Sequence, residues 1–329
     1  MSTRAEDRIT LAITAWLIAG VFIDGYAHVN IIDTETEDFF TLWHAIFYAA
    51  FVSLTGWIGW IAYRRRSDAA VLEWFPTGYR EAPIGIAIFA VGGIGDGIWH
   101  TVFGVEVGID ALLSPMHLVL FSGALILIWS PVRAATARRD PTPTLALGAA
   151  AVVTALMVFF IEYIFFLSET WIAGIPFEPE NDNDGWEYVS VFLAGAVVQV
   201  GVLLGPLLLV VNRWRLPLGS ATIIWGLAAF GERAAFNHGW SGVLSAIVGG
   251  IVFDLTNRFV PLPGRQLSVA AFFGPAAAFA TYFVLADIDQ GVEWPTEIWG
   301  GAIAMAGLTG LGLVAIQTSG RQERLVPTD

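Results

Sequence analysis

Two short segments of this chain place a carboxylate and an imidazole one helical turn apart. The first is DGYAH, from Asp24 to His28, and the second is DGIWH, from Asp96 to His100. Residues four apart lie on the same face of a helix, so each pair can act together on one ligand. Each segment lies near the end of a long apolar run. Ionisable side chains inside a membrane are costly, which indicates a function for these pairs.

Each segment is followed by a second histidine near the start of the next apolar run. His44 follows DGYAH and His117 follows DGIWH, so the pattern Asp-Gly-x-x-His…His occurs twice and uses four of the five histidines. The flanking residues also correspond, with a glycine four residues before each aspartate and a hydroxyl residue three before each second histidine: Gly20, Gly92, Thr41 and Ser114. We interpret this as a duplicated helical hairpin.

Two imidazoles and one carboxylate that converge form a three-ligand site with open positions, which zinc, copper and non-haem iron accept. The predicted metal ligands are Asp24, His28, His44, Asp96, His100 and His117. The chain has no cysteine, which excludes thiolate metal sites, iron–sulfur clusters and disulfides. A purely structural hydrogen-bond network and a proton or ion pathway are the alternatives.

The composition is that of an integral membrane protein. The chain has 329 residues, of which 56% are hydrophobic and 14% charged, and its mean hydropathy is +0.67. Ten runs are long enough to cross a bilayer as helices. They cover residues 9–31, 39–63, 82–104, 112–131, 143–168, 187–211, 217–236, 239–256, 267–287 and 297–317. The sequence therefore predicts an all-α, multi-pass protein of the plasma membrane.

The arginines fix the predicted orientation. All sixteen basic residues are arginine, and with the N-terminus inside, every one except Arg233 falls in an inner segment. Both termini are then cytoplasmic, and all six predicted ligands lie in the outer leaflet. The predicted divisions are a cytoplasmic tail over 1–8, duplicated hairpins over 9–131, a six-span remainder over 132–317 and a second tail over 318–329.

Charge narrows the classes of partner and cofactor. The net charge is −13, and an acidic chain without lysine is typical of salt-loving organisms. The absence of lysine excludes a retinal Schiff base. The arginines form no basic patch, so a nucleic-acid partner is not expected. The predicted partner is the lipid bilayer, and further subunits or a homo-oligomer are compatible with the wide outer loop at 168–187.

Three further ionisable residues occur at a similar predicted depth. Glu162 has apolar neighbours in FFIEYIFF, and Glu232 is followed by Arg233 and, a few residues later, His238. We predict catalytic proton-handling roles for Glu162 and Glu232, with His238 as a further candidate. Mutual neutralisation of Glu232 and Arg233 is the alternative for that pair.

The two triplets resemble the C subunit of the copper membrane monooxygenases that oxidise methane and ammonia. In that family one triplet is Asp/His/His and the other Asn/His/His, and each is a copper site. Asp24, His28 and His44 correspond to the first, and Asp96, His100 and His117 to the second, with aspartate in place of asparagine. The resemblance covers residues 20–120 and implies copper rather than zinc.

The sequence thus predicts a metal-binding membrane protein, with a copper or iron oxygenase-like activity on a lipophilic substrate that enters from the bilayer. One alternative is a transporter of divalent metal or protons, although the inner halves of the predicted spans contain almost no ionisable residues. Another is a haem protein with axial histidines such as His28 and His44. A carboxylate four residues from the histidine makes haem less favoured than copper, iron or zinc.

Overall fold

The structure is a computed structural model that describes residues 1–31, 39–104, 106, 108–177, 184–262 and 264–323. All regular elements in these residues are helical, and they divide into two compact units, Met1–Phe160 and Ile161–Asp329. The predicted all-α class is therefore confirmed. The acidic segment 33–38, which lies between the first two predicted spans, is outside the described residues.

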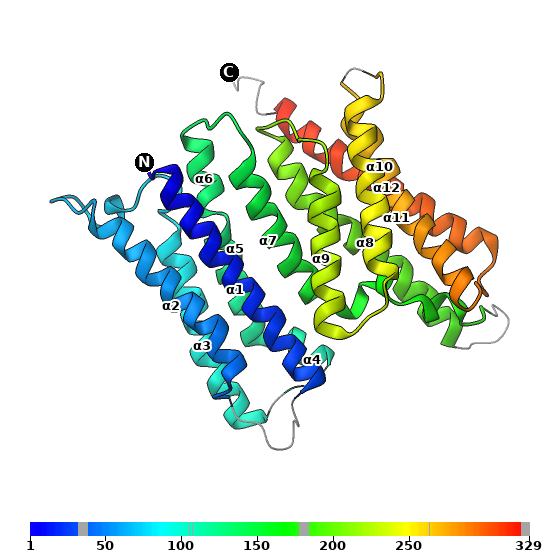
Figure 1. Cartoon of the computed structure of the whole chain (residues 1–329), viewed down its shortest axis with the longest axis horizontal. Helices are drawn as coiled ribbons and strands as arrows, with labels where there is room; N and C mark the ends of the chain where they lie inside the picture. The colour runs from blue at the N-terminus through cyan, green and yellow to red at the C-terminus, as the bar shows by residue number, and fades with distance from the viewer. Residues whose placement is uncertain (32–38, 105, 107, 178–183, 263, 324–329) are drawn as a thin grey trace. The chain divides into compact units, whose positions relative to one another are not determined.

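The first unit contains the predicted metal-site hairpins, several short helical segments and one further long helix. Its elements are α1 (Arg4–Asn30), α2 (Leu42–Tyr63), the 3₁₀ turn η1 (Val71–Trp74), α3 (Ala82–Phe103), α4 (Ile109–Leu113), α5 (Pro115–Ile128), α6 (Ser130–Ala137) and α7 (Thr144–Phe160). In Figure 1, α1 and α2 run side by side, and α3 packs against α5 to form the second pair.

The second unit begins with three short turns and continues with five long helices. Its elements are η2 (Glu162–Ile164), η3 (Phe166–Ser168), η4 (Thr170–Gly174), α8 (Asp184–Val211), α9 (Ser220–Phe236), α10 (Ser241–Phe259), α11 (Gln266–Asp289) and α12 (Thr296–Glu323). Small residues let α10 and α11 approach closely, since a Cβ added to Gly249 would lie 2.7 Å from the Cβ of Ala278.

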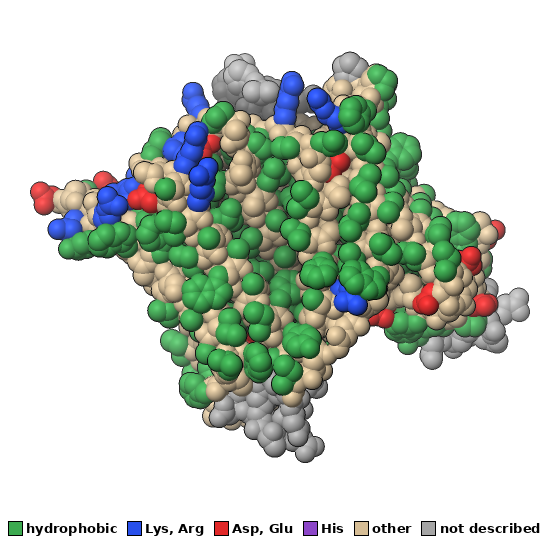
Figure 2. All heavy atoms as spheres, in the orientation of Figure 1, with side chains coloured by type: hydrophobic (Ala, Val, Ile, Leu, Met, Phe, Trp, Pro, Cys, Tyr) green, Lys and Arg blue, Asp and Glu red, His purple; other side chains and the backbone are tan. Residues whose placement is uncertain are grey.

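Eight helices in the described residues are long and apolar enough to span a membrane: α1, α2, α3, α5 continued by α6, α8, α10, α11 and α12. In Figure 2 apolar side chains cover much of the visible helix surface, and arginines gather near the start of α1. The chain is therefore a multi-pass helical membrane protein. Helices α7 and α9, with 17 residues each, occupy the other two predicted span positions, and the count of ten stays a prediction.

The predicted span over 143–168 is wrong at its outer end. Helix α7 ends at Phe160, because Ile161 leaves the helical region at φ −107° and ψ 16°, and three 3₁₀ turns follow. The Gln199 side-chain amide donates to the Ile164 carbonyl at 2.7 Å and so satisfies a backbone group that no longer has a helical partner. Glu162 therefore begins a turn instead of lying within a helix.

Each of the two hairpins contains an equivalent close contact at a glycine. A Cβ added to Gly20 in α1 would lie 2.7 Å from the Cβ of Phe47 in α2, and one added to Gly92 in α3 would lie 2.9 Å from the backbone nitrogen of Leu120 in α5. Each glycine comes four residues before its aspartate, and each partner three residues after the second histidine. The close approach brings the aspartate and the histidine of each pair to the same level.

The opposite end of the first unit is held by a buried polar network. Asp7 at the start of α1 is fully buried and pairs with the Arg138 guanidinium at 2.5 Å. The Tyr79 hydroxyl, just before α3, donates to the same carboxylate at 2.8 Å. This network therefore joins the start of α1, the end of α6 and the segment before α3.

Candidate metal centre

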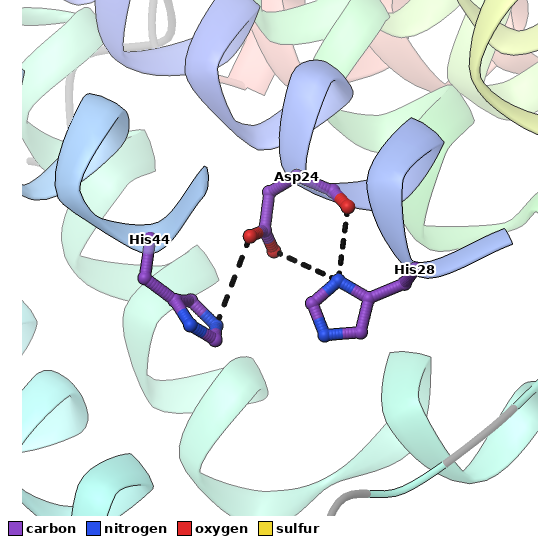
Figure 3. A group of neighbouring side chains, drawn as sticks. All are labelled: Asp24, His28 and His44. Carbon is purple, nitrogen blue, oxygen red and sulfur yellow. Dashed lines mark hydrogen bonds and ion pairs between the residues drawn. The ribbon is translucent and has the colours of Figure 1, made fainter. Parts of the chain in front are cut away.

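The first triplet comes together where α1 and α2 meet. The Asp24 carboxylate lies between the two imidazoles, with Oδ2 at 3.6 Å from Nδ1 of His28 and Oδ1 at 3.8 Å from Nε2 of His44 (Figure 3). The Nδ1 atom of His28 also lies 2.9 Å from the Asp24 carbonyl oxygen. One carboxylate and two imidazoles thus converge, as the spacing predicts.

The second triplet also gathers around its aspartate. Oδ1 of Asp96 lies 3.5 Å from Nε2 of His100 and 3.0 Å from Nε2 of His117. A further carboxylate joins it, because Oε2 of Glu106 lies 3.4 Å from Nδ1 of His100. Asp96 is fully buried, whereas His117 retains partial exposure.

The two triplets form one continuous cluster. The rings of His28 and His44 have centroids 5.6 Å apart, those of His44 and His100 6.1 Å, and those of His100 and His117 6.0 Å. Among the described residues, two sets of three have ligand atoms within 4.8 Å of one another: Asp24, His28 and His44, and His44, Asp96 and His100. His44 belongs to both sets, whereas the sequence assigns it to the first triplet alone. His117 contacts Asp96 without belonging to either set.

Backbone and hydroxyl groups orient two of the rings. Thr41 caps α2, accepting from the His44 amide at 3.1 Å, and its hydroxyl also lies 3.1 Å from Nδ1 of His44. Nδ1 of His117 contacts the Ala111 carbonyl. In both cases Nε2 is left facing an aspartate, which is how second contacts fix the orientation of metal-binding histidines. Ser114 takes the N-cap position of α5 but makes no capping hydrogen bond.

The donor set fits a cation better than a closed hydrogen-bond network. Both carboxylate oxygens of Asp96 and both ring nitrogens of His100 are buried without a hydrogen-bond partner among the described residues, so their close contacts lack hydrogen-bond alignment. Buried polar atoms of this kind are costly unless something else satisfies them. A bound metal ion would be coordinated by the carboxylate of Asp96 and a ring nitrogen of His100 at once.

An apolar cavity of about 70 Å³ adjoins the cluster in the first unit. Its polar lining consists of Asp24, His44 and His117, and the rest is apolar, including Phe47, Leu120 and Phe160. The carboxylate and the two imidazoles of this lining can hydrogen-bond a water molecule, whereas the apolar walls offer contacts to a small uncharged molecule. The cluster therefore borders a mostly apolar space large enough for a small reactant.

Glu162, Glu232 and His238 come together in the second unit. Nε2 of His238 lies 3.4 Å from Glu162 and 3.2 Å from Glu169, and its Nδ1 contacts Glu232. Ser168 donates to the buried Glu232 at 2.8 Å. The guanidinium of Arg233 stacks on the Trp240 ring at 4.0 Å. Glu232 thus has its own partners in His238 and Ser168.

Two carboxylates of these clusters were missed by sequence reasoning, because Glu106 and Glu169 look like ordinary residues of acidic outer loops. The signal for Glu106 is Gly104, which ends α3 with φ +86° and turns the chain back toward His100. Tyr48 was also missed, although it comes one helical turn after His44 and its ring lies 6.4 Å away. No comparable local signal identifies Glu169.

Comparison of the chain with models of known protein families, with characterised proteins and with solved structures found no match. The chemistry of the cluster therefore follows from its own geometry. That geometry shows His/Asp groups able to hold a metal ion in a polytopic helical membrane protein.

Proposed function

We propose that this protein binds copper through the His/Asp cluster of its first unit and oxidises a lipophilic substrate. The observation that carries the proposal is the position of His44, which completes two ligand sets at once. In this proposal the ligands form one joint centre rather than two separate sites, and they are Asp24, His28, His44, Asp96 and His100, with His117 in contact with Asp96. The buried, unsatisfied atoms of Asp96 and His100 support a cation there.

The chemistry of the ligand atoms limits which metal ions fit the centre. Imidazole and carboxylate suit Cu(II), Fe(II) and Zn(II), and the centre has no thiolate ligand because the chain has no cysteine. The resemblance to the copper monooxygenases favours copper over the other two. Copper, when bound, would supply one-electron and dioxygen chemistry that no side chain offers.

The chain's own residues would prepare the centre for that chemistry. Asp24 and Asp96 provide negative charge for a cation, and Thr41 orients the His44 ring. The mostly apolar cavity beside His44 would admit a small molecule such as dioxygen next to the centre. Glu162 and Glu232 stay candidates for moving protons, supported by their shared contact with His238.

The proposed setting is the outer leaflet of the plasma membrane, with ten spans, cytoplasmic termini and a duplicated hairpin. The arginine distribution supports the orientation. The matching Gly20–Phe47 and Gly92–Leu120 contacts support the internal repeat.

Metal analysis of the purified protein, with electron paramagnetic resonance and an absorption spectrum, tests the proposal. We expect stoichiometric copper with nitrogen hyperfine structure and no Soret band. The His44→Ala variant should lose more metal than His28→Ala, because only His44 belongs to both sets. Val91→Ala, at an exposed position on α3, is the control and should keep its copper. Folded protein that takes up no metal, or a Soret band, would overturn the proposal.

A further inference from the structure

A second, larger hollow lies between α2 and α3 in the first unit. It has a volume of about 610 Å³, within the range of roughly 300–1,000 Å³ typical of small-molecule sites. The α2 side contributes Tyr48, Phe51 and Val52, and the α3 side runs from Phe89 to Val102. We call this hollow the α2–α3 groove. From Phe89 to Val102 the helix rises by thirteen residues, which corresponds to a length of about 20 Å.

The groove is apolar and opens on the exposed face of α3. Among the described residues its lining contains no charged side chain, and the hydroxyls there belong to Tyr48 and Thr101. The Thr101 hydroxyl donates at 2.7 Å to the Gly97 carbonyl within its own helix, so it is already satisfied. Ile94 and Ile98 on the rim are 68% and 60% exposed in a membrane-spanning helix. The groove thus matches the chemistry of a hydrocarbon chain.

The inner wall of the groove touches the candidate metal centre. The Phe39 ring, part of the lining, stacks on His44 with centroids 5.1 Å apart and lies 6.0 Å from His100. Gly97 makes room for this ring, since an added Cβ would lie 3.3 Å from it. Tyr48 lines the groove and also lies beside His44. A single layer of aromatic rings therefore separates the groove from the shared ligand histidine.

We propose that the α2–α3 groove binds the alkyl chain of a single-chain amphiphile drawn from the bilayer, and that it holds this chain beside the metal centre. The groove lies next to His44 through Phe39 and ends toward the predicted outer interface at Val102, where a polar head could meet water. This inference rests on the proposed function, because it names the substrate class of the same centre.

Photo-crosslinking of the full-length protein tests the groove. The protein is placed in phosphatidylcholine nanodiscs with a sixteen-carbon fatty acid that carries a terminal diazirine, and labelled peptides are mapped by mass spectrometry. Gly97→Leu and Ile98→Trp fill the groove, whereas Val91→Trp adds the same bulk at a position on α3 that is 63% exposed and does not line it. Labelling of 39–52 and 89–102 should fall about tenfold in both filled variants.

The control should label like the native chain, and excess unlabelled fatty acid should compete. Equal labelling of the filled and control variants would contradict the proposal that the groove binds an alkyl chain. Crosslinks between two copies of the chain, in place of crosslinks to the probe, would contradict it as well. Copper is measured on the same samples to separate the two proposals. Groove labelling without copper would contradict the proposed function and still support chain binding in the groove. Copper without groove labelling would support the proposed function and contradict chain binding in the groove.

Discussion

At the scale of single residues, His44 joins the two halves of the centre. Its Nε2 faces Asp24, its ring lies 6.1 Å from that of His100, and Thr41 occupies its other nitrogen. A ligand held in this way has one usable nitrogen in a set direction. Loss of the orienting contact should therefore weaken metal binding without removing a ligand.

The Thr41→Val variant tests this orienting role. It removes the hydroxyl that contacts Nδ1 of His44, and metal affinity should fall by about 10- to 100-fold. The helix cap is lost as well, at a cost of about 1 kcal/mol. Thr41→Ser keeps both hydrogen bonds and should behave like the native chain. The measurement is a competition titration with a chelator, and equal affinities for the valine and serine variants would contradict the orienting role.

The charge of His238 makes the stability of the protein depend on pH. Burial by itself would lower the pKa of His238, but hydrogen bonds to Glu162 and Glu232 and the charge of Glu169 outweigh it and raise the pKa to about 10. The unfolded value is about 6.5, so the folded chain holds this proton more tightly. The resulting stabilisation is complete below pH about 6.5 and is lost as the pH rises through about 10.

A pH series of unfolding midpoints checks this sign. The native chain should lose stability between pH 7 and 10, and it has no lysine or cysteine to titrate there. His238→Gln should be less stable than the native chain at pH 7, and the difference should shrink as the pH approaches 10. A constant difference across the series would show that His238 is not held in its charged form.

At the scale of helices, close glycine contacts set the level of the ligands in both hairpins. Gly92 faces the backbone of Leu120 in α5, and Gly20 faces Phe47 in α2. Backbone cannot move aside as a flexible side chain can, so these contacts tolerate no added methyl group. The register of each hairpin, and with it the Asp-to-His contact, depends on them.

Gly92→Ala should destabilise the protein by about 1–3 kcal/mol through overpacking, and it should also lower copper occupancy. Gly56→Ala on α2 is the matched control, since an added Cβ there meets nothing within 4 Å. The control should be neutral or more stable by up to about 1 kcal/mol, because alanine favours helix. Unfolding in mixed detergent micelles measures the stability of both variants. Equal stability of the two variants would show that the α3–α5 approach is not tight.

At the scale of the whole molecule, the number of spans decides which residues share a side of the membrane. In the part of the chain that the structure describes, eight helices are long and apolar enough to span, and α7 and α9 have 17 residues each. If both cross, the turns after α7 lie outside and the segment before α9 lies inside. If neither crosses, these two positions exchange sides.

Single-cysteine variants show whether α7 crosses, because the native chain has no cysteine. Pro176→Cys lies in the exposed segment after η4, and Leu218→Cys lies before α9 at 58% exposure. With ten spans, a membrane-impermeant maleimide added to intact cells should label Pro176→Cys and not Leu218→Cys. The reverse pattern would show that α7 does not cross the membrane, which contradicts the count of ten. Lysed cells provide the control in which both positions react.

The sequence by itself determined the class of the protein and the candidates for its centre. Apolar runs identified the membrane helices because length and hydropathy are local properties. The four-residue spacing placed Asp24 with His28, and Asp96 with His100, because helical periodicity fixes which residues share a face. These features need no knowledge of which helices meet.

Only the tertiary structure decided how the parts combine. It made His44 common to two ligand sets, added Glu106 to His100 and ended α7 before Glu162. It also opened the groove beside Phe39 between α2 and α3. Each of these depends on contacts between segments distant in sequence or on a break in the backbone. Hydropathy and periodicity describe one helix at a time, so they carry no information on which faces pack together.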